Sequence, residues 1–190
     1  MSYRHVALLA AALLGPALPA GKVEGAYTTD GRLQVPQQYR EWIFLSAGLD
    51  MDYRQEAGTP DHSMFDNVFV DRVAYDTFIK TGTWPDGTLL VKEDRGGTEK
   101  GSINRHGKSQ TSELMGLEVH AKDTQRFAGG WAFFFFPSLR SEPAAQIPTA
   151  ADCYTCHRQH GAVDSTFVQF YPTLLSIATQ KKTLSPDYRP

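Results

Sequence analysis

The chain has 190 residues, which is enough for one ordinary domain with a substantial hydrophobic core. Its formal net charge is −2, so the composition gives no sign of a nucleic acid or an anionic membrane surface as a partner. The 11 phenylalanines suit a protein that must enclose a large, flat, apolar group.

Residues 1–20 have the pattern of a secretory signal peptide. A basic start at Arg4 precedes an apolar run over residues 6–14, and Ala20 supplies a small residue for cleavage. A membrane span needs about 20 apolar residues, so this run is too short to cross a bilayer, although an uncleaved anchor is the alternative. We therefore expect export to the periplasm, cleavage near Ala20, no membrane attachment afterwards, and a single domain over residues 21–190.

Strand patterns recur along the mature chain. Alternating or continuous apolar residues predict strands over 65–70, 88–93, 115–121 and 131–136. Residues 21–34 look like an arm that could add a short strand. Segments 50–63 and 94–112 are rich in Gly, Asp and other polar residues, which predicts a loop for the first and a loop or a wide hairpin connection for the second.

Helix signals occur between and after these strands. Helices are predicted to start at Pro36 and to cover 72–80 and 172–180. Asp71 is a suitable N-cap for the second of these helices, and Gly82 a suitable residue beyond its end. Together these elements predict an α+β domain, mainly an antiparallel β-sheet with short flanking helices.

The strongest chemical signal is Cys153-Tyr154-Thr155-Cys156-His157, which contains the only two cysteines of the chain. C-x-x-C-H is the attachment signature of a c-type haem, in which both thiols form thioethers and the histidine binds the iron. A redox or structural disulfide next to a histidine is the alternative. We expect one covalent haem c, held by Cys153 and Cys156 with His157 as the iron ligand. Thr149 and Asp152 resemble a capping box, so the motif should begin a short C-terminal haem-attachment helix that stops at Gly161.

The second axial position of the iron is expected to be open. A common small electron carrier has a methionine ligand far downstream of its motif, but no methionine follows His157 here. Met51, Met64 and Met115 lie upstream with nothing to support them as ligands, and His120, on a predicted strand, is the one real histidine candidate. An open position favours ligand binding or catalysis over electron carriage.

A series of short motifs extends from residue 35 to about 178. They are Pro36-x-x-Tyr39-Arg40-Glu41-Trp42, Asp86-Gly87-Thr88-x-x-Val91-Lys92-Glu93, Gly116-Leu117-Glu118, Lys122-Asp123-x-Gln125-Arg126-Phe127-Ala128, Gly130-Trp131-Ala132-Phe133-Phe134, Pro148-Thr149-Ala150, Cys153-x-x-Cys156-His157 and Phe167-x-Gln169-Phe170-Tyr171-Pro172. In their order and spacing the chain resembles the cytochrome P460 family, which includes the cytochromes c′-beta.

The resemblance implies a mostly antiparallel β fold, a homodimer, and a c-type haem on His157. Cytochromes P460 oxidise hydroxylamine, with nitric oxide chemistry leading to nitrous oxide, and carry a lysine cross-linked to the porphyrin. Lys92 falls at the position of that lysine, and Glu118 at that of a pocket carboxylate that acts as general base. From the residues alone, the pattern favours a strand-edge lysine that keeps its charge in water for Lys92 and an exposed residue between buried neighbours for Glu118, and the resemblance reverses this preference for Glu118.

Other residues favour the second role in the family, nitric oxide binding by c′-beta proteins in an apolar pocket. Asp66 stands where some hydroxylamine-oxidising members have Arg. Phe65 and Phe69 share a strand face, and we expect them to line the haem pocket. The favoured hypothesis is a hydroxylamine oxidoreductase with Lys92 and Glu118 as catalytic residues and a small c-type cytochrome as redox partner. A c′-beta-like nitric oxide binder without the cross-link is the alternative, and plain electron transfer is a third.

Overall fold

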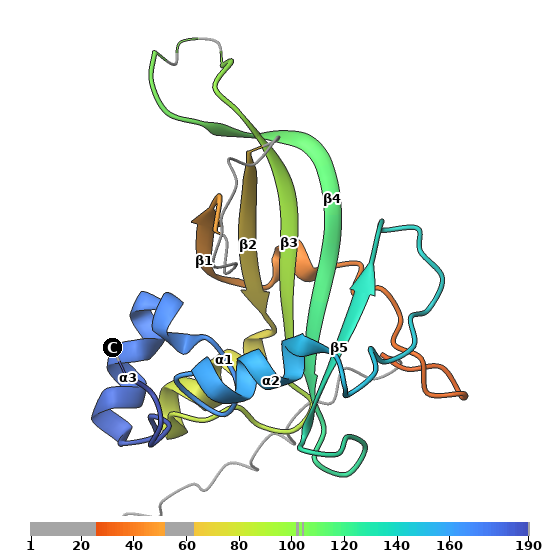
Figure 1. The fold of residues 1–190 in the computed structure, drawn as a ribbon, viewed down its shortest axis with the longest axis vertical. Helices are drawn as coiled ribbons and strands as arrows, with labels where there is room; N and C mark the ends of the chain where they lie inside the picture. Colours follow the sequence, from red (N-terminus) through yellow and green to blue (C-terminus); the bar gives the residue numbers. More distant parts are fainter. Residues whose placement is uncertain (1–25, 52–62, 102, 104, 190) are drawn as a thin grey trace, which may run out of the picture.

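The computed structural model describes residues 26–51, 63–101, 103 and 105–189. The predicted signal peptide and most of the predicted loop 50–63 lie outside the described residues. Five strands form one antiparallel sheet in the order β1-β2-β3-β4-β5 (Figure 1). They are β1 (Ile43–Leu49), β2 (Met64–Val70), β3 (Leu89–Thr98), β4 (Ser109–Lys122) and β5 (Trp131–Phe136). The predicted α+β class with an antiparallel sheet is confirmed.

The helices gather at one end of the sheet, and the long β3–β4 hairpin extends from the other end (Figure 1). They are α1 (Arg72–Thr81), α2 (Asp152–His160) and α3 (Pro172–Lys181). There are also two short 3-10 helices, η1 (Tyr39–Glu41), which lies apart from this group, and η2 (Val168–Phe170). Helix α1 has the predicted caps, because Asp71 accepts a hydrogen bond from the Ala74 N–H at 2.8 Å and Gly82 has a φ of 79°. Among the described residues, no helix combines the length and the apolar character that crossing a bilayer requires.

Two local predictions were wrong, and a third, the hairpin connection over 94–112, was right except in its length. The helix expected from Pro36 is one 3-10 turn, because the apolar residues that follow it pair with β2 as strand β1. The predicted loop 94–112 is shorter, since β3 continues to Thr98 and β4 begins at Ser109. Helix α2 begins after Ala151 without a side-chain cap, so the capping box does not form.

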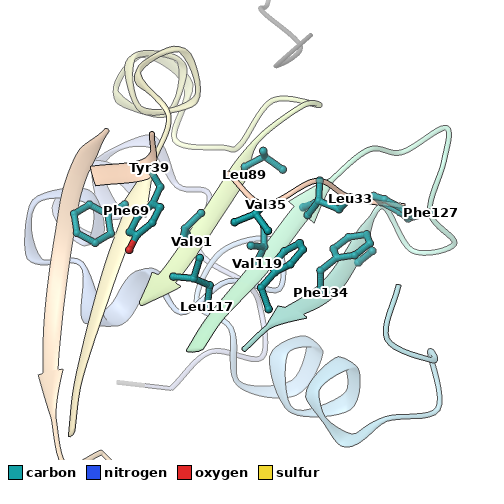
Figure 2. Close-up of a cluster of buried hydrophobic side chains, with 13 residues drawn as sticks. Leu33, Val35, Tyr39, Phe69, Leu89, Val91, Leu117, Val119, Phe127 and Phe134 are labelled. Atoms are coloured by element: carbon teal, nitrogen blue, oxygen red, sulfur yellow. The ribbon is translucent and has the colours of Figure 1, made fainter. Parts of the chain in front are cut away.

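The sheet separates two apolar clusters. On one face, the N-terminal residues Leu33 and Val35 cover Val91 and its neighbours (Figure 2). On the other face, Leu90 packs with residues of α1 and α3 such as Phe78. Successive residues of a strand point to opposite faces, so Lys92, two residues from Leu90, also faces the side of the helices.

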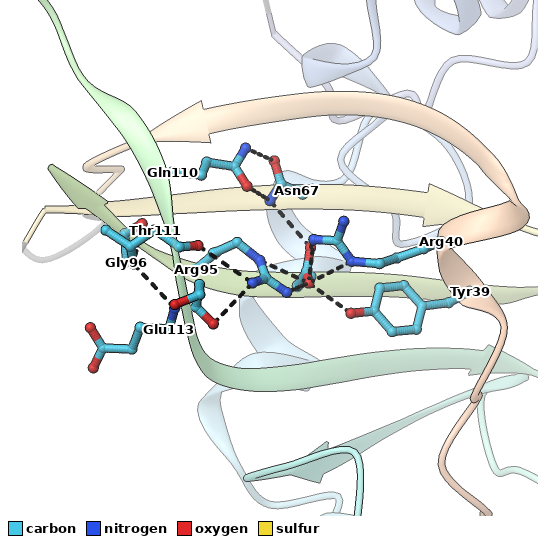
Figure 3. Close-up of polar contacts among 10 residues, drawn as sticks. Tyr39, Arg40, Asn67, Arg95, Gly96, Gln110, Thr111 and Glu113 are labelled. Carbon is cyan, nitrogen blue, oxygen red and sulfur yellow. Dashed lines mark hydrogen bonds and ion pairs between the residues drawn. The ribbon is translucent and has the colours of Figure 1, made fainter. Parts of the chain in front are cut away.

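A buried polar network stabilises the face opposite the helices (Figure 3). Glu93 is fully buried and accepts hydrogen bonds from the Tyr39 hydroxyl at 2.7 Å and from Arg40 Nη2 at 2.7 Å. Arg95 also pairs with it. Burial alone would raise the pKa of Glu93, but Arg95 and Arg40 outweigh burial and lower it. The network fixes β3 against η1 and leaves the residues on either side of Glu93 facing the helices.

Candidate haem site

A cavity of about 590 Å³ lies between the helix-bearing face of the sheet and the segment 153–172. Small-molecule and cofactor pockets typically measure about 300–1,000 Å³. The sheet contributes Met64, Asp66, Val68, Leu90, Lys92, Glu118 and His120 to the lining, and the opposite wall includes Cys153, Cys156, His157, Phe167 and Phe170. The structure therefore brings together five of the seven residues predicted for the site, namely Lys92, Glu118, Cys153, Cys156 and His157.

Helix α2 carries the C-x-x-C-H motif into this wall. Cys153 and Cys156 are three residues apart, so they occupy one side of the helix, and both thiols are free. Burial raises the pKa of the Cys153 thiol. The helix ends at the predicted Gly161, whose N–H donates to the His157 carbonyl at 2.9 Å. Two free thiols on one side of a helix, turned toward a cavity, suit thioether attachment better than the alternative of a disulfide.

His157 is held as a neutral imidazole. Its Nδ1 lies 3.0 Å from the Ser165 carbonyl oxygen, and since a carbonyl only accepts, Nδ1 carries the proton and Nε2 keeps its lone pair. Burial lowers the pKa of His157 to about 4. The ring stacks on Phe167, with 4.1 Å between centroids. A neutral imidazole with one nitrogen anchored to a carbonyl is the state that binds a metal ion through its other nitrogen.

His120, the histidine considered as a second iron ligand, is a direct neighbour of His157. Their ring centroids are 4.9 Å apart and the rings are nearly perpendicular. His120 also stacks on Phe133 at 4.0 Å and is buried. Two imidazoles in contact leave no space for a porphyrin between them. This placement therefore favours a role for His120 in packing beside His157 over a role as second iron ligand. Of the methionines considered, Met51 and Met64 line the cavity.

Lys92 is surrounded by three carboxylates. Its Nζ lies 2.8 Å from Asp94 Oδ1, 3.2 Å from Glu118 Oε1 and 3.3 Å from Asp66 Oδ1. Burial would lower the pKa of Lys92, but Glu118 and Asp94 outweigh it, so the pKa is raised and the amine is charged. Lys92 and Glu118 are also direct partners in the register of β3 and β4. Lys92 is thus an ion-paired residue of the cavity wall, in contrast to the solvent-directed edge lysine that the residue pattern allowed.

Asp94 was not predicted as a site residue, and Asp66 was predicted only as a departure from the family pattern. Their side chains are each 11% exposed, and they are paired across β2 and β3. Burial raises the pKa of Asp94 to about 7 against the opposing effect of Lys92. The sequence could have indicated Asp94, because residues two apart in a strand point to the same face and Asp94 lies two residues after Lys92.

Phe65 and Phe69 do not line the cavity. Phe69 packs in the cluster of the opposite face, where its ring centroid lies 5.5 Å from that of Tyr39. Phe65, two residues away on the same strand, shares that side, whereas Met64, Asp66 and Val68 face the cavity. The expectation that these two phenylalanines contact the cofactor is therefore corrected. The aromatic lining comes instead from Phe133, Phe167 and Phe170.

A largely apolar cavity on an antiparallel sheet, bordered by two free thiols and a neutral imidazole, fits a haem and defines a haem-binding α+β domain. The sequence matches the Cytochrome P460 family over residues 36–168, and the chain belongs to this family. Membership implies haem binding. No curated protein matches the chain.

Proposed function

We propose that the protein is a periplasmic mono-haem c-type cytochrome that oxidises hydroxylamine, together with nitric oxide, to nitrous oxide. Cys153 and Cys156 would hold the haem through thioethers and His157 would be its axial ligand. The haem supplies an iron that takes up electrons one at a time from a nitrogen compound bound to it. The two free thiols and the neutral His157 ring at one wall of the cavity support these assignments.

The observation that carries the proposal is the pairing of Lys92 with Glu118. Both side chains line the cavity that His157 borders, and Lys92 Nζ lies 3.2 Å from Glu118 Oε1. Lys92 is the residue we assign to the porphyrin cross-link. Glu118 is the proton acceptor for hydroxylamine, and because its side chain is 53% exposed it can pass protons on to water.

The proposed reaction is balanced in atoms and charge once an electron acceptor takes up the electrons that hydroxylamine loses. One hydroxylamine and one nitric oxide give one nitrous oxide, one water, one proton and one electron. Two hydroxylamines without nitric oxide give one nitrous oxide, one water, four protons and four electrons. Glu118 accepts the protons in turn, and the electrons pass to a small c-type cytochrome as the redox partner.

The alternative function is nitric oxide binding without a cross-link. The ion pairs of Lys92 favour it, because a charged ammonium is not a nucleophile. Phe65 and Phe69, which the sequence suggested in its favour, lie on the other side of β2, and the phenylalanines that line the cavity are Phe133, Phe167 and Phe170 instead. Electron transfer would need a sixth ligand such as Met51 or Met64, which line the cavity.

Mass spectrometry of the haem-bearing peptides tests the assignment of Lys92. A protease digest of the purified holoprotein is expected to give one haem species that carries both the Cys153–Cys156 peptide and the Lys92 peptide. Lys92→Met should lose only the second peptide, and Lys80→Met, at an exposed position of α1, should change nothing. A wild-type digest in which haem carries the cysteine peptide alone would favour the nitric oxide binder.

Kinetic measurements separate the two functions. The enzyme should turn over hydroxylamine when a one-electron oxidant is present, whereas the binding protein should bind nitric oxide tightly without turnover. A low-spin, six-coordinate resting spectrum would contradict both and favour electron transfer. Export and a homodimeric state belong with this function, and cell fractionation and light scattering of the purified protein test them.

A further inference from the structure

The Ser165 carbonyl that holds the His157 ring belongs to a tight turn from Val163 to Thr166, the Ser165 turn. Val163 and Thr166 form an isolated antiparallel bridge, in which the Thr166 N–H donates to the Val163 carbonyl at 2.8 Å. The two residues between them, Asp164 and Ser165, have φ values of 49° and 57°. Positive φ at both central positions is typical of a type I′ turn, whose second position is usually glycine. A serine there costs conformational free energy, so contacts from outside must stabilise the turn.

Trp84, in the segment between α1 and β3, supports the Ser165 turn through one hydroxyl group. Its indole Nε1–H donates to Thr166 Oγ1 at 2.9 Å, and the Thr166 hydroxyl in turn donates to the Val163 carbonyl at 2.5 Å. Trp84, Thr166 and Val163 are all buried. A buried group that loses its partner cannot bind water instead, so this chain of hydrogen bonds keeps the two ends of the turn together.

Lys122, the last residue of β4, contacts the Ser165 turn at a second point. Its ammonium group pairs with the Asp164 carboxylate and donates to the Trp84 carbonyl oxygen at 2.7 Å. The ammonium also lies 5.7 Å from the centre of the Trp131 ring. The backbone N–H of Lys122 donates to the carbonyl of Thr88, the residue before β3, at 2.9 Å. Lys122 therefore joins the turn and Trp84 to the end of the sheet.

We propose that Trp84 and Lys122 are positioning residues for the iron ligand. They hold the Ser165 turn in the conformation that places the Ser165 carbonyl oxygen 3.0 Å from His157 Nδ1. Neither is among the described residues that line the cavity, so they act through the turn rather than on a bound molecule. This inference rests on the proposed function, in which His157 is the axial ligand of the haem.

The hydrogen bond to the Ser165 carbonyl sets how strongly the His157 imidazole donates to an iron. An imidazole whose second nitrogen donates a hydrogen bond is fixed in orientation and becomes a more basic ligand. A more basic ligand stabilises ferric over ferrous iron and lowers the reduction potential. Trp84 and Lys122 therefore help to set the potential at which electrons are taken up from a nitrogen compound and passed to the redox partner.

Resonance Raman spectroscopy and redox titration of the haem-loaded protein test this role without any turnover. The stretching frequency of the bond between ferrous iron and His157 rises with the strength of the Nδ1 hydrogen bond. Thr166→Val removes the hydroxyl that connects Trp84 to the turn, and Lys122→Met removes the ion pair with Asp164. Each variant should lower the frequency and raise the reduction potential by about 59 mV, which is a tenfold change in the one-electron equilibrium.

Tyr39→Phe is the matched control for a loss of stability. It removes a buried hydroxyl from the face of the sheet opposite the helices, where that hydroxyl donates to Glu93. The variant should lower the free energy of unfolding as Thr166→Val does, but leave the iron–histidine frequency and the reduction potential unchanged. Shifts of the same size in Tyr39→Phe would mean that both quantities follow general stability, and would overturn the inference.

Ser165→Gly in the Thr166→Val background is the rescue experiment. Glycine adopts a φ of 57° without steric cost and keeps the backbone carbonyl, so the frequency should return towards its wild-type value although the hydroxyl is still missing. No recovery, or wild-type values in both Thr166→Val and Lys122→Met, would overturn the inference. A protein that shows the shifts but fails to oxidise hydroxylamine would overturn the proposed function and leave this inference intact.

Discussion

Lys92 and Glu118 are direct partners in adjacent strands, and Lys92 Nζ lies 3.2 Å from Glu118 Oε1. Their separation is therefore set by the register of β3 and β4 rather than by a loop. Side chains on paired strands keep their positions better than side chains on mobile segments, which suits two groups that must face one bound molecule. The network around Glu93 on the opposite face fixes the same stretch of β3.

Glu118→Gln should retain haem but lose hydroxylamine turnover. The amide has almost the shape of the carboxylate but cannot accept a proton, and a general base contributes about 10²–10⁴-fold to the rate. Steady-state rates with a one-electron oxidant and the absorbance of the haem give both quantities. Glu113→Gln is the matched control, because Glu113 is exposed on the same strand. A Glu118→Gln rate within twofold of the wild type would remove Glu118 from the mechanism.

Much of the fold follows from local signals. Asp71 and Gly82 bound α1 as the sequence predicts, and Gly161 ends the helix that carries Cys153 and His157. Each of these residues acts on its immediate backbone, so a single sequence contains the information. Lys92 and Glu118 were assigned through the family resemblance, and the register of the sheet brings them together.

The side of β2 that faces the cavity could not be predicted locally. Both faces of this strand pack against other residues, so Phe65 and Phe69 on one side look as suitable for a pocket as Met64 and Val68 on the other. Asp94 was missed for a related reason. Its significance depends on its pairing with a residue of another strand, and pairing between distant segments is not encoded in the alternation of either one.

Asp94→Asn should stabilise the haem-free protein increasingly as the pH rises. The pKa of Asp94 is raised in the folded state to about 7, so its ionisation costs folding free energy above its usual pKa, and the cost is complete above about pH 7. The advantage of the variant in the free energy of unfolding should therefore grow from pH 4 to pH 7, by about 1 kcal/mol or more.

Urea unfolding at several pH values measures this advantage. Asp76→Asn should show a difference from the wild type that does not change with pH, because Asp76 is an exposed residue of α1. A constant difference for Asp94→Asn as well would mean that Asp94 is ionised throughout this range.

Glu93→Gln should destabilise the fold by about 2–3 kcal/mol at pH 7, since it removes the buried negative charge that pairs with Arg40 and Arg95. The pKa of Glu93 is lowered in the folded state, so its contribution is present above its unfolded pKa and is lost as pH falls through the folded value. The difference in the free energy of unfolding should thus shrink at pH 3. Glu41→Gln, on the exposed side of η1, serves as the control, and a difference equal at pH 3 and pH 7 would contradict the charged role of Glu93.

If His157 is the axial ligand as proposed, Gly161→Ala should weaken its bond to the iron. A Cβ at this position would lie 2.6 Å from the His157 carbonyl oxygen and 2.7 Å from the Thr166 N, both backbone atoms that cannot rotate away. The segment after α2 must then move, and with it the Ser165 carbonyl that fixes the His157 ring. Overpacking of this kind costs about 1–3 kcal/mol.

The haem spectrum distinguishes this effect from a general loss of stability. Gly161→Ala should retain haem on Cys153 and Cys156 but show a weakened or heterogeneous axial ligand in its resting spectrum. Gly129→Ala is the control. Its added methyl meets no atom within 4 Å, so the variant loses stability only because alanine disfavours the φ of +83° at this position, which lies far from the motif. If both variants lose stability while both spectra stay equal to the wild type, the contact between Gly161 and the backbone after α2 does not position His157.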